Sequence, residues 1–272
     1  MRKEVSASSD HRICRMQHIY AVAKGLLGDT APISSDELEK YFDIKREYKN
    51  KNDILRGLLG SLQDRNMQNN VIGFYSPKRA DIFKDIFCGY DAGAILSAYG
   101  SEEDLFERFD KEFTIGNPDS KNNSFRKYAK SVLSACSFIE RFESPDDFTK
   151  FVELFSYNEL SSVALPMVLA REIYGLGFAL ACNWLKDLGF NEYPKPDVHI
   201  IKIFHALGLC ENNDYSDYKA VVEMAKATGD TPFNVDRTFW LIASGRYFLH
   251  DEKVPSGKDD IIRIANSAKG AN

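Results

Sequence analysis

Apolar residues recur at helical spacing along nearly the whole chain, and this periodicity limits the folds that the chain can adopt. Between residues 13 and 23, apolar side chains stand three or four positions apart, which is typical of one face of an amphipathic helix. We expect Gly25 and Gly28 to end this helix. No segment alternates β-branched residues with the turn signals of a β-hairpin. The sequence therefore predicts an all-α protein of roughly a dozen short helices.

Capping residues and helix breakers mark the ends of the expected helices. The segment from Ser34 to Glu37 supplies a cap-type residue and early acidic residues for a short second helix. An apolar stripe from Ile54 to Leu62 marks a third helix that runs to about Asp64. The other helices are expected at about residues 78–88, 91–99, 101–112, 123–142, 145–155, 159–174, 178–189, 197–208, 215–228 and 232–249.

The composition is that of an ordinary globular protein. The chain has 272 residues, of which 44% are hydrophobic and 28% are charged, so disordered and fibrous classes are excluded. This length favours two domains. No apolar run approaches the roughly 18 residues that a membrane span needs, and no apolar segment of a secretory signal follows Met1. We therefore expect a cytoplasmic protein with no membrane partner.

Cysteine and charge patterns exclude some kinds of site. The five cysteines lie far apart, and no cysteine or histidine cluster has the spacing of a zinc or iron–sulfur site. The net charge of −5 argues against nonspecific coating of nucleic acid. Residues 45–85 carry nine basic and five acidic side chains, whereas residues 91–119 carry two and eight. This asymmetry fits either a basic face turned toward a partner or ordinary surface charge.

Two glycines in the segment Gly175-Leu176-Gly177 predict a tight turn between two helices. Glycine permits positive φ and lets another chain approach the backbone closely. The unpaired N–H groups at the start of the following helix can then donate to a phosphate. A dinucleotide-binding turn is excluded because its third glycine position holds Leu180 and the segment follows a helix. A purely structural helical hairpin remains the alternative.

A proline-bracketed loop leads into a helix that begins at Asp197, twenty residues after Gly177. By default, an aspartate at this position is an N-cap. The hairpin, the spacing and the Pro-Asp-helix entry resemble the helix-hairpin-helix DNA glycosylase superfamily. The similarity is best from Leu165 to Leu209 and extends more weakly to the basic segment at residues 125–130. The remainder is similar to a bacterial branch that lacks an iron–sulfur cluster.

The resemblance implies a role for each matched position. Gly175, Gly177 and Ala179 match the hairpin whose backbone holds a DNA phosphate, and Asp197 matches the catalytic carboxylate. Members that also cut the strand carry a lysine where this chain has Ala179. Without that amine no Schiff base can form, so the resemblance implies release of the base alone. A carboxylate beside the sugar stabilises its developing positive charge and orients the attacking water.

The function implied is that of a monofunctional DNA glycosylase, which acts on a flipped-out base and leaves an abasic site. Alkylated purines are the default substrate, and hypermodified phage cytosines such as glucosylated hydroxymethylcytosine are the other option. The role is accordingly base excision in DNA repair or antiviral defence. The partner is duplex DNA that contains such a base, and the protein is expected to be a monomer. The alternative is a noncatalytic helix-hairpin-helix DNA-binding protein.

The resemblance also implies two helical subdomains with DNA and the target base held in a cleft between them. A helical barrel is expected at residues 47–195, including the hairpin, and the second subdomain at residues 1–46 and 196–272. Neither a cofactor nor a metal is expected, although the hairpin could hold a monovalent cation.

Further candidates for DNA contact are weighed against ordinary packing or surface roles. A loop after an amphipathic helix supplies side chains that could fill the gap left by a flipped nucleotide. Aromatic residues and one histidine could line the base pocket, and two lysines could contact phosphates. The wedge candidates are Met67, Gln68 and Asn69, the pocket candidates are Trp184, Tyr174, His199 and Trp240, and the phosphate contacts are Lys195 and Lys202.

Overall fold

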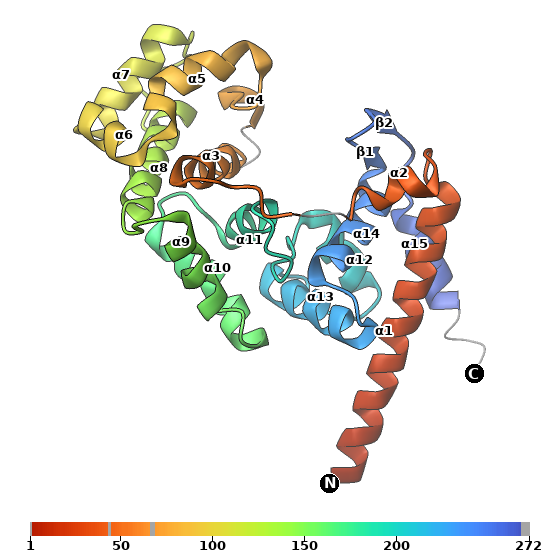
Figure 1. Cartoon of the computed structure of the whole chain (residues 1–272). Helices are drawn as coiled ribbons and strands as arrows, with labels where there is room; N and C mark the ends of the chain where they lie inside the picture. Colours follow the sequence, from red (N-terminus) through yellow and green to blue (C-terminus); the bar gives the residue numbers. More distant parts are fainter. Residues whose placement is uncertain (1, 43–44, 66–68, 268–272) are drawn as a thin grey trace. The chain divides into compact units, whose positions relative to one another are not determined.

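The fold is all-α, as the periodicity predicts. The structure is a computed structural model that describes residues 2–42, 45–65 and 69–267 (Figure 1). Within these residues the only sheet is a pair of two-residue strands. The chain divides into two compact units: unit 1 comprises residues 1–45 and 189–272, and unit 2 comprises residues 46–188.

The second boundary between the units falls after Leu188, ahead of the expected position after residue 195. Hydrogen bonds explain the difference. Phe233 N–H donates to the carbonyl of Asn191 at 3.0 Å, and the Tyr218 hydroxyl donates to the carbonyl of Glu192 at 3.3 Å. The segment that precedes Asp197 is therefore fastened within unit 1.

Unit 1 is a bundle built around the long N-terminal helix. Met16, Ile19 and Ala23 from this helix are buried in one cluster with Phe204 and Phe239. The elements of unit 1 are α1 (Arg2–Thr30), α2 (Ser35–Glu39), α12 (Val198–Ala206), α13 (Asp214–Thr228), α14 (Pro232–Ser244), β1 (Arg246–Tyr247), β2 (Glu252–Lys253) and α15 (Lys258–Ser267).

Helix α1 does not end at its glycines, which corrects the expectation from sequence. It continues through Gly25 and Gly28 to Thr30. A glycine inside a helix costs about 1 kcal/mol relative to alanine. The buried face of α1 packs on α13, α14 and α15, and this contact outweighs that cost.

Helix α14 ends at Ser244, short of the expected end at residue 249. Gly245 follows in the left-handed conformation at φ 62°, and its N–H donates to the carbonyl of Leu241. The chain then forms the antiparallel strands β1 and β2 and the further helix α15, neither of which the sequence pattern predicted. A left-handed glycine directly after the last helical turn is a common helix stop.

Unit 2 is a helical bundle in which α8 packs on α3, α6 and α7. Its core is rich in aromatic side chains, and Phe83, Phe87, Phe109 and Tyr128 are all buried with ring contacts among them. The elements are α3 (Lys51–Leu62), α4 (Asn69–Ile72), η2 (Pro77–Arg79), α5 (Ala80–Ile86), η3 (Cys88–Tyr90), α6 (Ala92–Ala98), α7 (Glu102–Glu112), α8 (Ser124–Ile139), α9 (Pro145–Leu154), α10 (Glu159–Glu172) and α11 (Phe178–Asp187).

Side-chain caps set the starts of several helices. Ser101, Ser144 and Asn158 each accept a hydrogen bond from a backbone N–H of the first turn of the helix that follows. Among the described residues, no helix combines the length and the apolar character needed to cross a lipid bilayer.

Candidate functional site

The first candidate feature is the turn between α10 and α11, in unit 2. Helix α10 ends at Glu172 and α11 begins at Phe178, so the turn is short. Leu176 is buried, and its N–H donates to the carbonyl of Ile173 at 3.2 Å. The backbone of Tyr174 donates to Ser134 Oγ of α8 at 2.9 Å. The turn is therefore anchored to α8 by both packing and a hydrogen bond.

The two glycines of this turn have different roles. Gly175 has a φ of 86°, and a β-carbon there would lie closer than 3.0 Å to Ser131 Oγ. Only glycine fits this position without strain. Gly177 has an extended backbone, and a β-carbon there would meet no atom within 4 Å. Gly175 is thus required by the fold, whereas Gly177 keeps the surface open in front of α11.

Helix α11 begins without a side-chain cap. Its N-cap is Gly177, which has no side chain to accept a hydrogen bond from the first turn. The N–H of Ala179 has no carbonyl four residues earlier within the helix, because it lies in the first turn. An anion at this end would also be favoured by the helix dipole. The backbone here can hold a phosphate.

The second candidate feature is Asp197, in unit 1. It is the N-cap of α12, and its Oδ1 accepts hydrogen bonds from the N–H groups of His199 at 2.8 Å and Ile200 at 3.1 Å. These bonds fix the carboxylate. The side chain is half-buried, and Oδ2 has no hydrogen-bond partner in the described part of the chain. Capping therefore occupies only one of the two oxygens.

The loop before Asp197 is held rigidly. Pro194 and Pro196 are buried, and neither has an N–H group to donate. The N–H of Lys195, between them, donates to Oδ2 of Asp236 at 3.0 Å. Asp236 lies on α14 and is 1% exposed. A buried carboxylate thus sets the path of the chain into the candidate catalytic residue.

A third acidic residue near this loop was not anticipated from the sequence. Asp217 of α13 is fully buried, and its Oδ2 has no hydrogen-bond partner among the described residues. Burial, together with the negative charges of Asp236 and Asp197, raises the pKa of Asp217 well above its usual range. In sequence, Asp217 looks like an ordinary acidic residue near the start of a helix, so no local signal marks its burial.

The tryptophans proposed for a base pocket have different surroundings. Trp184 is fully buried in unit 2, where its ring packs on Phe138 and Phe148 and its Nε1–H donates to the carbonyl of Ile54 at 3.3 Å. A base cannot reach it without rearrangement of the core. Trp240 is partly buried in unit 1 beside Phe248.

Three further predicted contacts, His199, Lys195 and Lys202, lie at or near the surface. His199 is half-buried, and its backbone N–H donates to the carboxylate of Asp197. Lys195 is half-buried and Lys202 is exposed, both in unit 1. The wedge candidates Met67 and Gln68 lie outside the described residues, and Asn69 is the first residue of α4.

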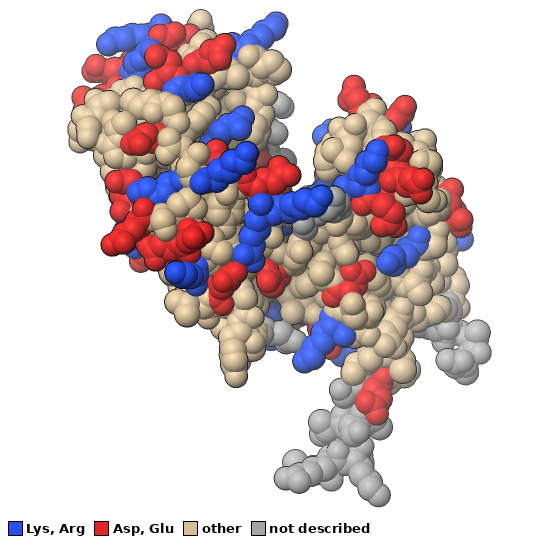
Figure 2. All heavy atoms as spheres, viewed as in Figure 1, with Lys and Arg blue, Asp and Glu red and all other residues tan. Residues whose placement is uncertain are grey.

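Basic side chains gather beside the hairpin within unit 2. A surface pocket of about 530 Å³ is lined by Tyr174, by four basic residues that include Lys127 and Lys130 of α8, and by the acidic residues Glu102, Glu103 and Asp119. The guanidinium of Arg65 lies 5.0 Å from the centre of the Tyr174 ring. On the face shown in Figure 2, basic and acidic side chains are interspersed over both units. The sequence had marked residues 125–130 as basic but gave no signal for the position of Arg65.

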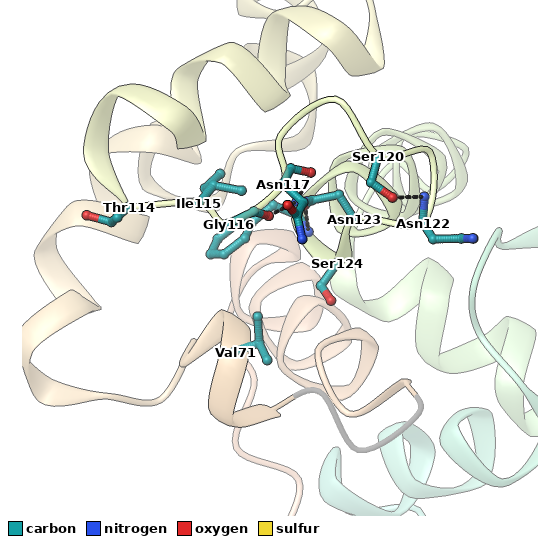
Figure 3. Close-up of a pocket in the computed structure, with 10 residues that line it drawn as sticks. Val71, Thr114, Ile115, Gly116, Asn117, Ser120, Asn122, Asn123 and Ser124 are labelled. Carbon is teal, nitrogen blue, oxygen red and sulfur yellow. Dashed lines mark hydrogen bonds between the residues drawn. The ribbon is translucent and has the colours of Figure 1, made fainter.

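A second pocket in unit 2 contains none of the predicted site residues. It has a volume of about 240 Å³ and is formed by the loop before α8 together with Val71 (Figure 3). The amide of Asn123 donates to the carbonyls of Gly116 and Asn117 at 2.9 and 3.2 Å. No lining residue is acidic, basic or a histidine. This pocket is therefore a product of loop structure and offers no acid or base for catalysis.

The comparisons with known proteins give no further assignment. A search of protein-family models, of curated proteins and of solved structures finds no significant match to this chain. Within the described residues, no three side chains of the His, Cys, Asp and Glu types are grouped so that they could hold a metal ion. Two separate candidate features therefore remain: the hairpin turn in unit 2 and the half-buried Asp197 in unit 1.

Proposed function

We propose that the protein is a monofunctional DNA glycosylase, similar to the helix-hairpin-helix superfamily, that uses Asp197 to release a base from duplex DNA. The observation that carries the proposal is the hydrogen bonding of the Asp197 carboxylate. Its Oδ1 is held by two backbone N–H groups, while Oδ2 has no partner among the described residues. A carboxylate that is fixed in this way can stabilise a cationic sugar without first reorganising.

The hairpin between α10 and α11 is the second feature that supports the proposal. The start of α11 has no side-chain cap, and Gly177 leaves space in front of it. Backbone donors of this kind hold a phosphate with little side-chain charge, which is compatible with a net charge of −5. Only twenty residues separate Gly177 from Asp197. In this proposal the hairpin holds a phosphate of the DNA on which Asp197 acts.

Release of the base without strand cleavage follows from the residue at position 179. Ala179 has no amine and cannot form a Schiff base with the sugar. In this proposal Asp197 orients or deprotonates a water molecule, whose oxygen bonds to C1′ while the bond between C1′ and the base breaks. The base leaves with a proton, and an abasic site remains. Alkylated purines or a hypermodified phage cytosine are the substrates proposed, in cytoplasmic repair or defence.

The experiment is incubation of the full chain with three labelled substrates: alkylated duplex, deaminated duplex and phage DNA that contains glucosylated hydroxymethylcytosine. The expected result is strand breaks only after hot alkali, with the released base identified by mass spectrometry. Asp197→Asn should keep the Oδ1 cap and the fold but lose base release by about a thousandfold or more. Release at the wild-type rate by this variant would overturn the assignment.

Asp91→Asn is the matched control. Asp91 is also an aspartate N-cap, and its Oδ1 accepts from the N–H of Ala94 at 2.7 Å. This variant makes the same chemical change at a helix start in unit 2 and should leave base release unchanged.

The second candidate is a noncatalytic DNA-binding protein. It is favoured by the fact that N-capping by itself explains an aspartate at position 197. Firm duplex binding with no base released from any substrate would support this candidate over the enzyme.

A further inference from the structure

Arg65 carries a charge that the described residues leave unsatisfied. Its Nη1 is buried and has no hydrogen-bond partner among them. The guanidinium packs over the ring of Tyr174, which holds it in place without accepting its N–H groups. A buried guanidinium donor without an acceptor costs free energy, so an acceptor brought to this side chain would relieve that cost.

The hairpin turn lies directly against this side chain. A β-carbon on Gly175 would lie 3.1 Å from Nη1 of Arg65. The glycine therefore brings the backbone of the turn next to the guanidinium. Because Arg65, Gly175 and Tyr174 all belong to unit 2, their proximity depends on that unit alone.

Two lysines of α8 extend the cluster. The Nζ of Lys130 lies 4.7 Å from the centre of the same Tyr174 ring, so this ring contacts two cations. Lys127 lines the 530 Å³ pocket together with Tyr174 and also lines a smaller pocket together with Arg65. The cluster thus continues from the hairpin along α8.

Three acidic residues, Glu102, Glu103 and Asp119, line the same pocket. Glu103 pairs with Arg126, and Glu102 lies 3.8 Å from Lys130, where both side chains are about half exposed. Such an exposed pair is weak in water. For Arg65 and Lys127, the described residues provide no ion pair.

We propose that Arg65, Lys127 and Lys130, arranged around Tyr174, form a second phosphate-binding site that holds the DNA strand beside the hairpin. This inference rests on the proposed function for its ligand, the backbone of duplex DNA. A phosphodiester suits the site because it offers charged acceptor oxygens to a guanidinium and to ammonium groups at once. Arg65 acts here as a backbone contact, and the Tyr174 ring holds two of the cations.

The test is equilibrium binding of the full chain to a labelled duplex over a range of KCl concentrations. Arg65→Gln and Lys127→Gln should each reduce the slope of log affinity against log salt by about 1, the effect of one lost phosphate contact. Each should weaken binding roughly tenfold at low salt. Lys150→Gln, an exposed lysine of α9, is the control that should change neither quantity.

Thermal unfolding separates this role from a structural one. If the Arg65 donor is unsatisfied in the free protein, Arg65→Gln should not lower the melting temperature even though it weakens DNA binding. A lowered melting temperature together with an unchanged salt slope would overturn the inference. Lys127→Gln provides the same binding test should Arg65→Gln fail to fold.

The salt dependence of DNA binding tests this site independently of catalysis. Reduced salt slopes in a protein that releases no base would support this site and contradict the proposed enzyme. Unchanged salt slopes in a protein that does release the base would support the enzyme and contradict this site. Preferential binding of polyglutamate or duplex RNA by the wild-type protein would overturn the choice of DNA as ligand.

Discussion

The carboxylate of Asp236 accepts a hydrogen bond from the backbone N–H of Lys195 at 3.0 Å. Lys195 lies between two prolines, so its N–H is one of the few donors with which the loop can be fastened. The bond joins α14 to the segment that leads into Asp197. The position of the candidate catalytic residue therefore depends on a buried side chain about forty residues further along the chain.

Replacing Asp236 should reveal this dependence. Asp236→Ala removes the acceptor and should lower the free energy of unfolding by about 1–3 kcal/mol, since the Lys195 N–H loses its partner. Asp236→Asn keeps an oxygen acceptor and should lose less. If Asp197 releases the base, the alanine variant should reduce kcat more than it changes KM. Denaturant unfolding and base release at saturating DNA provide the measurements, and equal losses in both variants would contradict the hydrogen-bond explanation.

Asp217 should make unit 1 less stable as the pH rises. The unfolded chain releases this proton near pH 4, whereas burial and two neighbouring carboxylates raise the pKa of Asp217 in the folded chain. Between these values the native state holds one proton more than the unfolded state. The stability contributed by the protonated acid is therefore complete below about pH 4 and is lost as the pH rises through the folded pKa.

Asp217→Asn removes this titration. The variant should be more stable than the wild type at pH 8, and the difference should shrink toward pH 4, by at most about 1.4 kcal/mol per pH unit. Urea unfolding followed by circular dichroism at several pH values measures the effect. Asp259→Asn, at a carboxylate that is 95% exposed on α15, is the control. A variant that is less stable than the wild type at pH 8 would contradict a protonated Asp217.

The helices were predictable from sequence because their signals are local. Ser101, Ser144 and Asn158 cap helices where the pattern placed helix starts. The turn at Gly175 also has a local signal, since two glycines stand between apolar periodic segments. Asp197 as an N-cap follows from the same rules.

The remaining features depend on contacts between distant segments, which periodicity does not encode. Helix α1 passes through Gly25 because helices near the other end of the chain cover its apolar face. The two tryptophans look alike in sequence, yet only Trp184 is fully buried. The position of Arg65 beside Tyr174 depends on how α3, α8 and the hairpin pack. Such positions become visible only once the chain is folded.

The two hairpin glycines should respond differently to alanine. Gly175→Ala places a β-carbon at positive φ and against Ser131, so the free energy of unfolding should fall by more than about 2 kcal/mol. Gly177→Ala meets no atom and should cost less than about 1 kcal/mol, but its methyl group should obstruct a phosphate at α11 and weaken DNA binding. Thermal unfolding and DNA titration separate these effects. A Gly177→Ala variant that binds DNA as the wild type does would argue against phosphate binding at this end of α11.

The turn between β1 and β2 offers a further test, because one tyrosine hydroxyl fastens it. Tyr41 is buried, and its hydroxyl accepts from the N–H of Leu249 at 3.0 Å and lies 3.0 Å from Nδ1 of His250. The other ring nitrogen of His250 lies 2.8 Å from a carboxylate oxygen of Glu37. These contacts join the turn to α2.

Tyr41→Phe removes the hydroxyl and leaves the ring, which packs edge-on against Tyr247 and Phe248 at centroid distances of 5.8 and 5.0 Å. Because packing is retained, the loss should reflect the hydrogen bonds alone, about 1–2 kcal/mol of unfolding free energy. Amide exchange at Leu249 should accelerate strongly while α13 keeps its protection. Tyr215→Phe, at a half-exposed ring of α13, is the control that should leave both measurements unchanged. Unchanged exchange at Leu249 in the Tyr41 variant would show that packing alone holds the turn.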